Sequence, residues 1–223
     1  MYNYELGSYY VHNSECYSDG YVDYDPPVSL NSYFLICSNC MSPLWRDDIV
    51  FDYDSPVDDL PKSMDVYDLP LSRKLNYAFN VAKYYSDIIK DGFTNTVDKE
   101  VKLRIEMWHL LNNRNRYGAT GIFQHLLNGR FRIARMLYKE RKQQKQEDLV
   151  SLSLFKENLD RLISIFKPIN EDEILTKAEM YRENRNFKES LSLLKEVDEL
   201  SNSKAYRVIK RAAKRRNSRV TKL

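Results

Sequence analysis

Two hydrophobic patterns divide the chain near Pro70. After Pro70, apolar residues recur every three or four positions, as in Leu75, Phe79, Ala82 and Tyr85. This spacing places apolar side chains along one side of an α-helix. Turn-forming residues interrupt the pattern at 91–92, 117–118, 128–129, 168 and 184–186. These breaks predict about seven or eight helices.

Before Pro70, the chain has short segments rich in aromatic and β-branched residues, which predict strands. They are 9–11, 15–17, 21–24, 33–36 and 49–53. Asp19-Gly20 accepts positive φ at low cost, so we expect a tight hairpin there. Residues 54–70 are acidic and rich in proline, which predicts an extended linker or a wrapping segment.

One stretch of the helical part has the features of a helical hairpin. Asn170 and Glu173 have the spacing of a capping box and predict a helix that begins at Glu171. Residues 178–183 and 187–200 then resemble one tetratricopeptide repeat, with Ala178 and Ser190 small enough for close helix crossing. A poorer match at 129–138 does not have the spacing of a regular array. A generic helical bundle is the alternative.

Charge is distributed unevenly along the chain. Residues 1–70 contain thirteen Asp or Glu against two Lys or Arg, whereas the whole chain has a net charge of only +3. Such asymmetry suggests segments with distinct roles. We therefore expect an acidic, aromatic module at 1–70 and a basic helical domain at 71–223.

Composition places the chain among folded proteins. Hydrophobic residues make up 43% of it, and 6 Gly and 7 Pro are too few for a low-complexity chain. The longest apolar run, Tyr33 to Cys37, is far shorter than the roughly 20 residues of a membrane span. No Lys or Arg precedes Arg46, so the basic region of a signal peptide is missing. We expect a cytoplasmic protein that does not cross a membrane.

The three cysteines form a candidate metal site. Cys37 and Cys40 are separated by two residues, a spacing that lets a tight turn direct two thiolates at one ion. Cys16 and His12 complete a Cys3His set for structural zinc. With four protein ligands no position remains for a substrate water, so this zinc would stabilise the fold.

Other interpretations of these cysteines remain open. One is a different fourth ligand, or an ion shared between chains. Another is a set of buried thiols without metal, because cysteine is among the most often buried residue types. A redox pair is a third, although Met41 to Pro43 does not have the character of the helix start that usually lowers a thiol pKa.

The motifs around the cysteines carry a wider resemblance. They are Tyr17-Ser-Asp-Gly20, Cys37-Ser-Asn-Cys40, Leu44-Trp45 and Asp47-Asp48. With the helical part, they resemble uncharacterised bacterial proteins that join a zinc-ribbon-like knuckle to tetratricopeptide-like repeats. Such ribbons usually have Pro after the first Cys and Gly after the second, where this chain has Ser38 and Met41. The resemblance implies an architecture and no established activity.

The sequence contains no motif for catalysis. A phosphate-binding glycine loop, a nucleophile elbow and a zinc-protease helix motif are all missing. His109 and His125 are expected to be packed helix residues, and Trp45 is expected in a core. The acidic residues Asp19, Asp23, Asp25, Asp47 and Asp48 are expected to form a solvated surface.

The C-terminal segment has the strongest charge signal. Residues 203–223 contain nine Lys or Arg and no acidic residue. Ala205, Val208, Ile209, Ala212 and Ala213 predict one apolar side of a helix that caps the hairpin. If the helix instead bound nucleic acid, the contacting residues would be Lys210, Arg211, Lys214 and Arg215.

These patterns predict an α+β protein, predominantly α, with a zinc-ribbon-like module followed by tetratricopeptide-like helical hairpins. Stacked hairpins form extended binding surfaces. We therefore expect a non-enzymatic adaptor that binds a protein or peptide and holds structural zinc. The alternative is a nucleic-acid-associated protein that uses the basic C-terminal helix.

Overall fold

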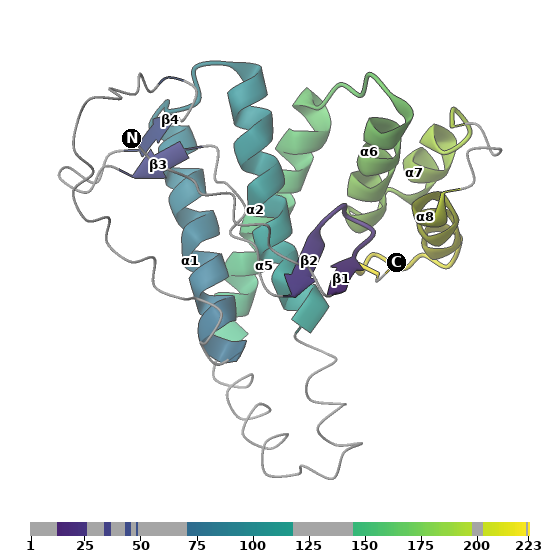
Figure 1. Cartoon of the computed structure of the whole chain (residues 1–223), viewed down its shortest axis with the longest axis horizontal. Coiled ribbons are helices and arrows are strands. Elements are labelled where there is room, and N and C mark those ends of the chain that lie inside the picture. Colours follow the sequence, from purple (N-terminus) through teal and green to yellow (C-terminus); the bar gives the residue numbers. More distant parts are fainter. Residues whose placement is uncertain are drawn as a thin grey trace, which may run out of the picture. The chain divides into compact units, whose positions relative to one another are not determined.

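The computed structural model is predominantly helical (Figure 1). It describes residues 13–25, 34–36, 43–45, 48, 71–117, 145–197, 203–221 and 223. The chain divides into two compact units, 1–14 with 23–69 and 15–22 with 70–223. The short segment 15–22 therefore belongs to the unit that contains the helices.

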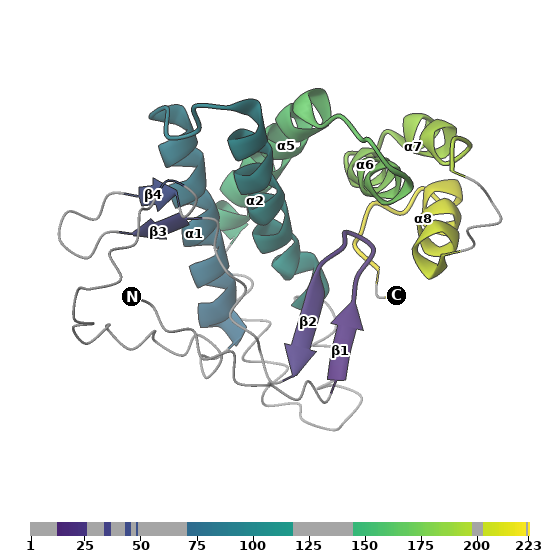
Figure 2. The same cartoon turned by 45° about the horizontal axis from the view of Figure 1, so that its top comes forward.

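The first hairpin forms where the sequence predicts it. Strands β1, Asn13–Cys16, and β2, Val22–Asp25, form a two-stranded sheet (Figure 2). In the turn between them the Gly20 N–H donates to the Tyr17 carbonyl over 3.0 Å, and Gly20 has φ +80°. Glycine adopts this left-handed conformation at little cost, which explains the turn at Asp19-Gly20.

A second hairpin lies in the other unit. Strands β3, Phe34–Ile36, and β4, Pro43–Trp45, pair antiparallel, with Phe34 opposite Trp45. Trp45 is buried, as expected for a core residue, since only 4% of it is exposed. The sequence did not predict β4. The strands expected at 9–11 and 49–53 and the linker expected at 54–70 lie outside the described residues.

Six helices occur within the part of the chain that the structure describes. They are α1 (Leu71–Lys90), α2 (Val97–Tyr117), α5 (Lys145–Ile165), α6 (Glu171–Glu183), α7 (Phe187–Leu193) and α8 (Lys204–Lys214). The predicted breaks at 91–92, 117–118, 168 and 184–186 each lie at or beside a helix end, whereas the end of α7 was not predicted and the break at 128–129 lies outside the described residues. No helix in the described ranges is long and apolar enough to span a membrane.

The predicted capping box at the start of α6 is present in part, with its return bond displaced by one residue to Ile169. The Asn170 side chain accepts a hydrogen bond from the Glu173 N–H over 2.9 Å. The Glu173 carboxylate in turn accepts from the Ile169 N–H over 2.8 Å. These bonds satisfy backbone donors that have no partner within the helix, so α6 begins at Glu171 as predicted.

The helices pack in sequence order and then close into a group of three. Helix α1 contacts α2, α2 contacts α5, and α5 contacts α6, whereas α6, α7 and α8 all contact one another (Figures 1 and 2). One apolar cluster contains Trp108, Leu159, Leu162, Phe166 and Met180. The second contains Leu175, Ala178, Leu194, Val197, Tyr206 and Ile209. The second cluster holds α8 on the hairpin of α6 and α7.

The hairpin of α6 and α7 differs from the prediction in its second helix. Ala178 and Ser190 are both fully buried, as close helix crossing requires. Helix α7 was expected to extend to Leu200, but it is regular only to Leu193. Beyond it, the Lys195 N–H bonds to the Ser192 carbonyl over 3.1 Å, an i to i−3 bond that tightens the last turn. The second repeat match, at 129–138, lies outside the described residues.

Candidate functional site

Helix α8 has one apolar side, and that side is buried. Its buried residues are Tyr206, Ile209, Ala212 and Ala213. Tyr206 and Ile209 pack in the cluster with residues of α6 and of the segment after α7. The predicted apolar stripe is correct for Ile209, Ala212 and Ala213, whereas Ala205 and Val208 are half-buried. Helix α8 therefore caps the α6–α7 hairpin, as the sequence predicted.

The opposite side of α8 is basic and exposed. Lys204, Arg207, Arg211 and Lys214 follow this side at helical spacing, and Arg215, Arg216 and Arg219 continue beyond the helix. All seven are exposed, and none has an ion pair with another described residue. In α2 and α5 the pattern is different, because Arg104 and Arg161 both pair with Glu100.

The four residues predicted to contact nucleic acid do not have the same surroundings. Arg211, Lys214 and Arg215 are exposed. Lys210 is half-buried: its ammonium donates to the Tyr206 hydroxyl over 2.8 Å and lies 4.8 Å from the centre of the Tyr206 ring. Lys210 therefore connects the basic side of α8 to its buried side.

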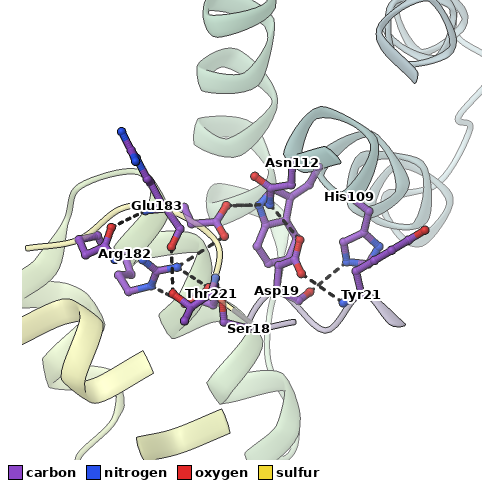
Figure 3. Close-up of polar contacts among 12 residues, drawn as sticks. Ser18, Asp19, Tyr21, His109, Asn112, Arg182, Glu183 and Thr221 are labelled. Carbon is purple, nitrogen blue, oxygen red and sulfur yellow. Dashed lines mark hydrogen bonds and ion pairs between the residues drawn. The ribbon is translucent and has the colours of Figure 1, made fainter. Parts of the chain in front are cut away.

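The segment after α8 is fastened to the hairpin turn. The Ser18 N–H donates to the Thr221 carbonyl over 2.8 Å, and the Thr221 N–H donates to the Ser18 hydroxyl over 2.9 Å (Figure 3). The Leu223 N–H donates to the Cys16 carbonyl over 2.8 Å. These bonds follow the antiparallel pattern, so the segment pairs with the turn as a strand would.

Arg182 provides a second attachment for this segment. It lies in the last turn of α6, is fully buried, and donates to the Asn217 carbonyl. Its other guanidinium nitrogens hold Glu179 in a two-point ion pair, with distances of 2.6 and 2.5 Å. A paired, hydrogen-bonded guanidinium is the form in which arginine is stable in an interior.

Two further carboxylates lie near Arg182 (Figure 3). Glu183 accepts hydrogen bonds from the Trp108 indole over 2.7 Å and from the Asn112 amide over 2.9 Å. The same amide donates to Asp19 over 3.0 Å. Asp19, Glu179 and Glu183 thus face a single buried cation. We call these three carboxylates, with Arg182 and Asn112, the buried carboxylate cluster.

The pKa of Glu183 is raised well above its ordinary value, first because the side chain is buried and then because Glu179 and Asp19 are negatively charged. Glu183 therefore keeps its proton to a higher pH than an exposed glutamate does. Its Oε1 and the Asn112 Oδ1 have no hydrogen bond to any described atom. The cluster consequently contains two buried polar atoms without a hydrogen-bond partner among the described residues, and such atoms are costly.

The position of Asp19 corrects one prediction from the sequence. It was expected on a solvated acidic surface, but only 2% of it is exposed. The turn places its carboxylate against Asn112 and its carbonyl 3.0 Å from His109 Nε2. Charge patterning along the chain cannot reveal this, because the burial comes from a contact 90 positions away. Of the other four, Asp48 is exposed, as expected.

His109 is a packed helix residue, as the sequence predicted. Its ring stacks on Trp108 with centroids 5.4 Å apart and meets Tyr21 edge-on at 5.8 Å. His125 lies outside the described residues. The surroundings of His109 explain why the hairpin turn is held against α2.

The buried cluster was not predicted, although α6 carries a signal for it. Glu179 lies four positions after Leu175, and Arg182 lies four positions after Ala178, so both charges fall on the apolar side of the helix. Charged residues at core positions indicate a buried ion pair. The tertiary partners Asp19 and Asn112 have no such signal.

The predicted zinc ligands lie mostly outside the described residues. Cys16, at the end of β1, is described and is exposed, whereas His12, Cys37 and Cys40 are not described. Within the described part of the chain, no group of three or more His, Cys, Asp or Glu residues is placed to hold a metal ion. The zinc site stays a prediction.

Comparison with known proteins gave no match: no family model, no curated protein and no solved structure is similar to this chain.

Proposed function

We propose that the protein binds the phosphate backbone of a nucleic acid through the basic side of α8. The observation that supports this proposal is the row Lys204, Arg207, Arg211 and Lys214, exposed and without ion pairs to other described residues. Clustered positive charge attracts nucleic acid through release of counterions, independently of base sequence.

The rest of α8 suits this role. Its apolar side is buried in the cluster of α6 and α7, so the helix need not leave the fold to bind. Capping and binding use opposite sides of one helix and are compatible. Because α8 is already packed, the backbone that carries these charges needs no ordering when the ligand binds, which lowers the entropic cost of binding.

The test measures binding of labelled 20-base-pair RNA and DNA duplexes by fluorescence anisotropy over a range of salt concentrations. Four phosphate contacts predict that the logarithm of affinity falls by about 3 to 4 for each tenfold rise in salt. Arg207→Glu, Arg211→Glu and Lys214→Glu together should abolish binding at 0.1 M salt and leave Tm nearly unchanged. The control is Lys83→Glu, an exposed lysine on α1.

Two results would contradict the proposal. One is no binding of either duplex at micromolar protein. The other is binding to poly-glutamate as tight as binding to the duplexes, which would favour an acidic protein partner and the adaptor function expected from the sequence. Structural zinc bound by Cys16, Cys37, Cys40 and His12, and a tetratricopeptide-like role for the α6–α7 hairpin, remain proposals beside this one.

A further inference from the structure

Two arginines have a backbone conformation that favours glycine. Arg185 has φ +64° and Arg216 has φ +52°. Among the described residues, the others with positive φ are Gly20 and Gly92. A side chain with a Cβ adopts this region only at an energetic cost. The chain therefore carries arginine at two places where glycine would be more stable.

Arg185, Arg216 and Gly92 occupy equivalent positions. Each directly follows the C-cap residue of its helix. Arg185 follows α6, Arg216 follows α8, and Gly92 follows α1. In each helix the same two hydrogen bonds close the end, the Schellman pattern. In each pair a backbone N–H donates to a backbone carbonyl. The donor and acceptor positions are 92 to 89 and 93 to 88 in α1, 185 to 182 and 186 to 181 in α6, and 216 to 213 and 217 to 212 in α8. Because Gly92 ends α1 in the same way, the helix end itself does not require arginine.

Other structural explanations do not account for these arginines. Both side chains are exposed, and neither has an ion pair or hydrogen bond with another described residue. A cation near a helix C-terminus does interact favourably with the helix dipole. However, Lys90 in α1 and Lys214 in α8 already supply such a charge from unstrained positions.

The C-terminal ends of α6 and α8 are joined. Arg182, three residues before Arg185, donates to the carbonyl of Asn217, the residue that follows Arg216. Arg216 therefore follows the row of cations on α8 directly, and Arg185 lies at the helix end that contacts the segment after Arg216. A guanidinium presents a rigid pair of donors that matches two oxygens of a phosphate.

We infer that Arg185 and Arg216 are ligand-contacting residues that each bind a backbone phosphate of the nucleic acid. This inference rests on the proposed function of α8 and extends that surface to the end of α6. Glycine at either position would make the end of the helix more stable. A role in binding explains why arginine is kept there in spite of its strained backbone.

The test replaces each arginine by glycine. Arg185→Gly and Arg216→Gly should each keep or raise the Tm, by about 2 °C for a chain of this size. Each should weaken binding to the 20-base-pair RNA duplex about fivefold or more at 0.1 M salt. Each should also reduce the salt slope by about 0.9, because one phosphate contact is lost. Lys83→Ala, which removes the same charge elsewhere, should change neither Tm nor affinity.

The possible failures are distinguishable. Glycine variants with normal affinity and salt slope, in a protein whose binding is abolished by charge reversal on α8, would overturn this inference and leave the proposed function intact. A lower Tm in the glycine variants would show that the arginines stabilise the fold, and would also overturn it. Failure of the unmodified protein to bind either duplex would overturn both proposals.

Discussion

The indole N–H of Trp108 donates a hydrogen bond to Glu183 Oε2 over 2.7 Å and joins side chains 75 positions apart. Trp108 belongs to the apolar cluster of α2, α5 and α6, whereas Glu183 belongs to the buried carboxylate cluster. Among the described residues, the bond thus connects the largest fully buried side chain to an acid whose pKa is raised well above its ordinary value. Through Trp108 and Asn112, α2 is therefore hydrogen-bonded to one buried carboxyl group at the end of α6.

We predict that Glu183→Gln raises the free energy of unfolding at pH 8. The folded-state pKa of Glu183 is raised, so the unfolded chain releases this proton at lower pH than the folded chain does. The contribution of Glu183 is therefore full below pH about 4.5 and is lost as pH rises through the folded pKa. Glutamine keeps an acceptor for Trp108 and Asn112 and has no proton to lose. Urea unfolding at pH 5 and pH 8 measures the difference.

The matched control for this prediction is Glu189→Gln, an exposed residue on α7. It should leave the pH dependence unchanged. Glu183→Ala should destabilise the fold by about 2 to 4 kcal/mol, because it removes the acceptor for two buried donors and leaves a cavity. If the Glu183→Gln variant were less stable than the unmodified protein at pH 8, the prediction that the folded state favours a neutral Glu183 would be contradicted.

For Glu100 we predict a contribution to the free energy of unfolding that depends on pH in the opposite direction. Its pKa is lowered to about 2, chiefly by the hydrogen bonds from Arg161 and also by those from Arg104. Both bonds from Arg161 measure 2.9 Å. A lowered folded-state pKa stabilises the protein above pH about 4.5, and this stability is lost as pH falls towards 2. Because half of the Arg161 side chain is exposed, we expect only about 1 kcal/mol from this site.

The measurement for Glu100 compares Glu100→Gln with the unmodified protein. The variant should have the lower Tm at pH 7, and the difference should shrink as pH approaches 2. Glu157→Gln is the control, since Glu157 is exposed on α5. A difference in Tm that stays constant between pH 7 and pH 2 would show that the ion pairs are not its cause.

The zinc prediction is one ion for each chain, bound by Cys16, Cys37, Cys40 and His12. Elemental analysis of native protein measures it, and a value below about 0.2 equivalent would contradict it. Cys16→Ser and His12→Ala should each reduce the zinc content, whereas His109→Ala, with its ring already packed between Trp108 and Tyr21, should not. A chelator should loosen the N-terminal module and leave most of the helical signal in circular dichroism.

The sequence predicted local structure well and long-range contacts poorly. The break at Asn184 to Asn186, the start of α6 at Glu171 and the turn at Gly20 all follow from residue types within a few positions of each feature. The burial of Asp19 does not, because it depends on Asn112, 93 positions away. Periodicity records which side of a helix is apolar and does not record which segment covers it.

For the candidate binding surface too, the sequence predicted the local pattern of the helix and missed the contacts of individual side chains. The sequence correctly placed Arg211, Lys214 and Arg215 outside the apolar stripe of α8. It also placed Lys210 there, although the Tyr206 side chain holds that ammonium. The left-handed conformation of Arg216 is not visible in the sequence, because nothing in the residue types around it marks a positive φ at an arginine.

The last prediction concerns the crossing of α6 and α7. Ala178 and Ser190 are both fully buried, so the site has no room for a larger side chain. Ala178→Leu should lower the free energy of unfolding by about 1 to 3 kcal/mol, because the added atoms separate the helices or force strained rotamers. Ala178→Gly lowers it for a different reason, a weaker helix, and should not displace α8. Lys188→Ala, at an exposed position on α7, is the control and should be nearly neutral.

Since α8 packs on the same cluster, Ala178→Leu should also expose the α8 segment to proteolysis before the rest of the domain. Equal stability of the Ala178→Leu and Lys188→Ala variants would contradict close crossing of the two helices at Ala178.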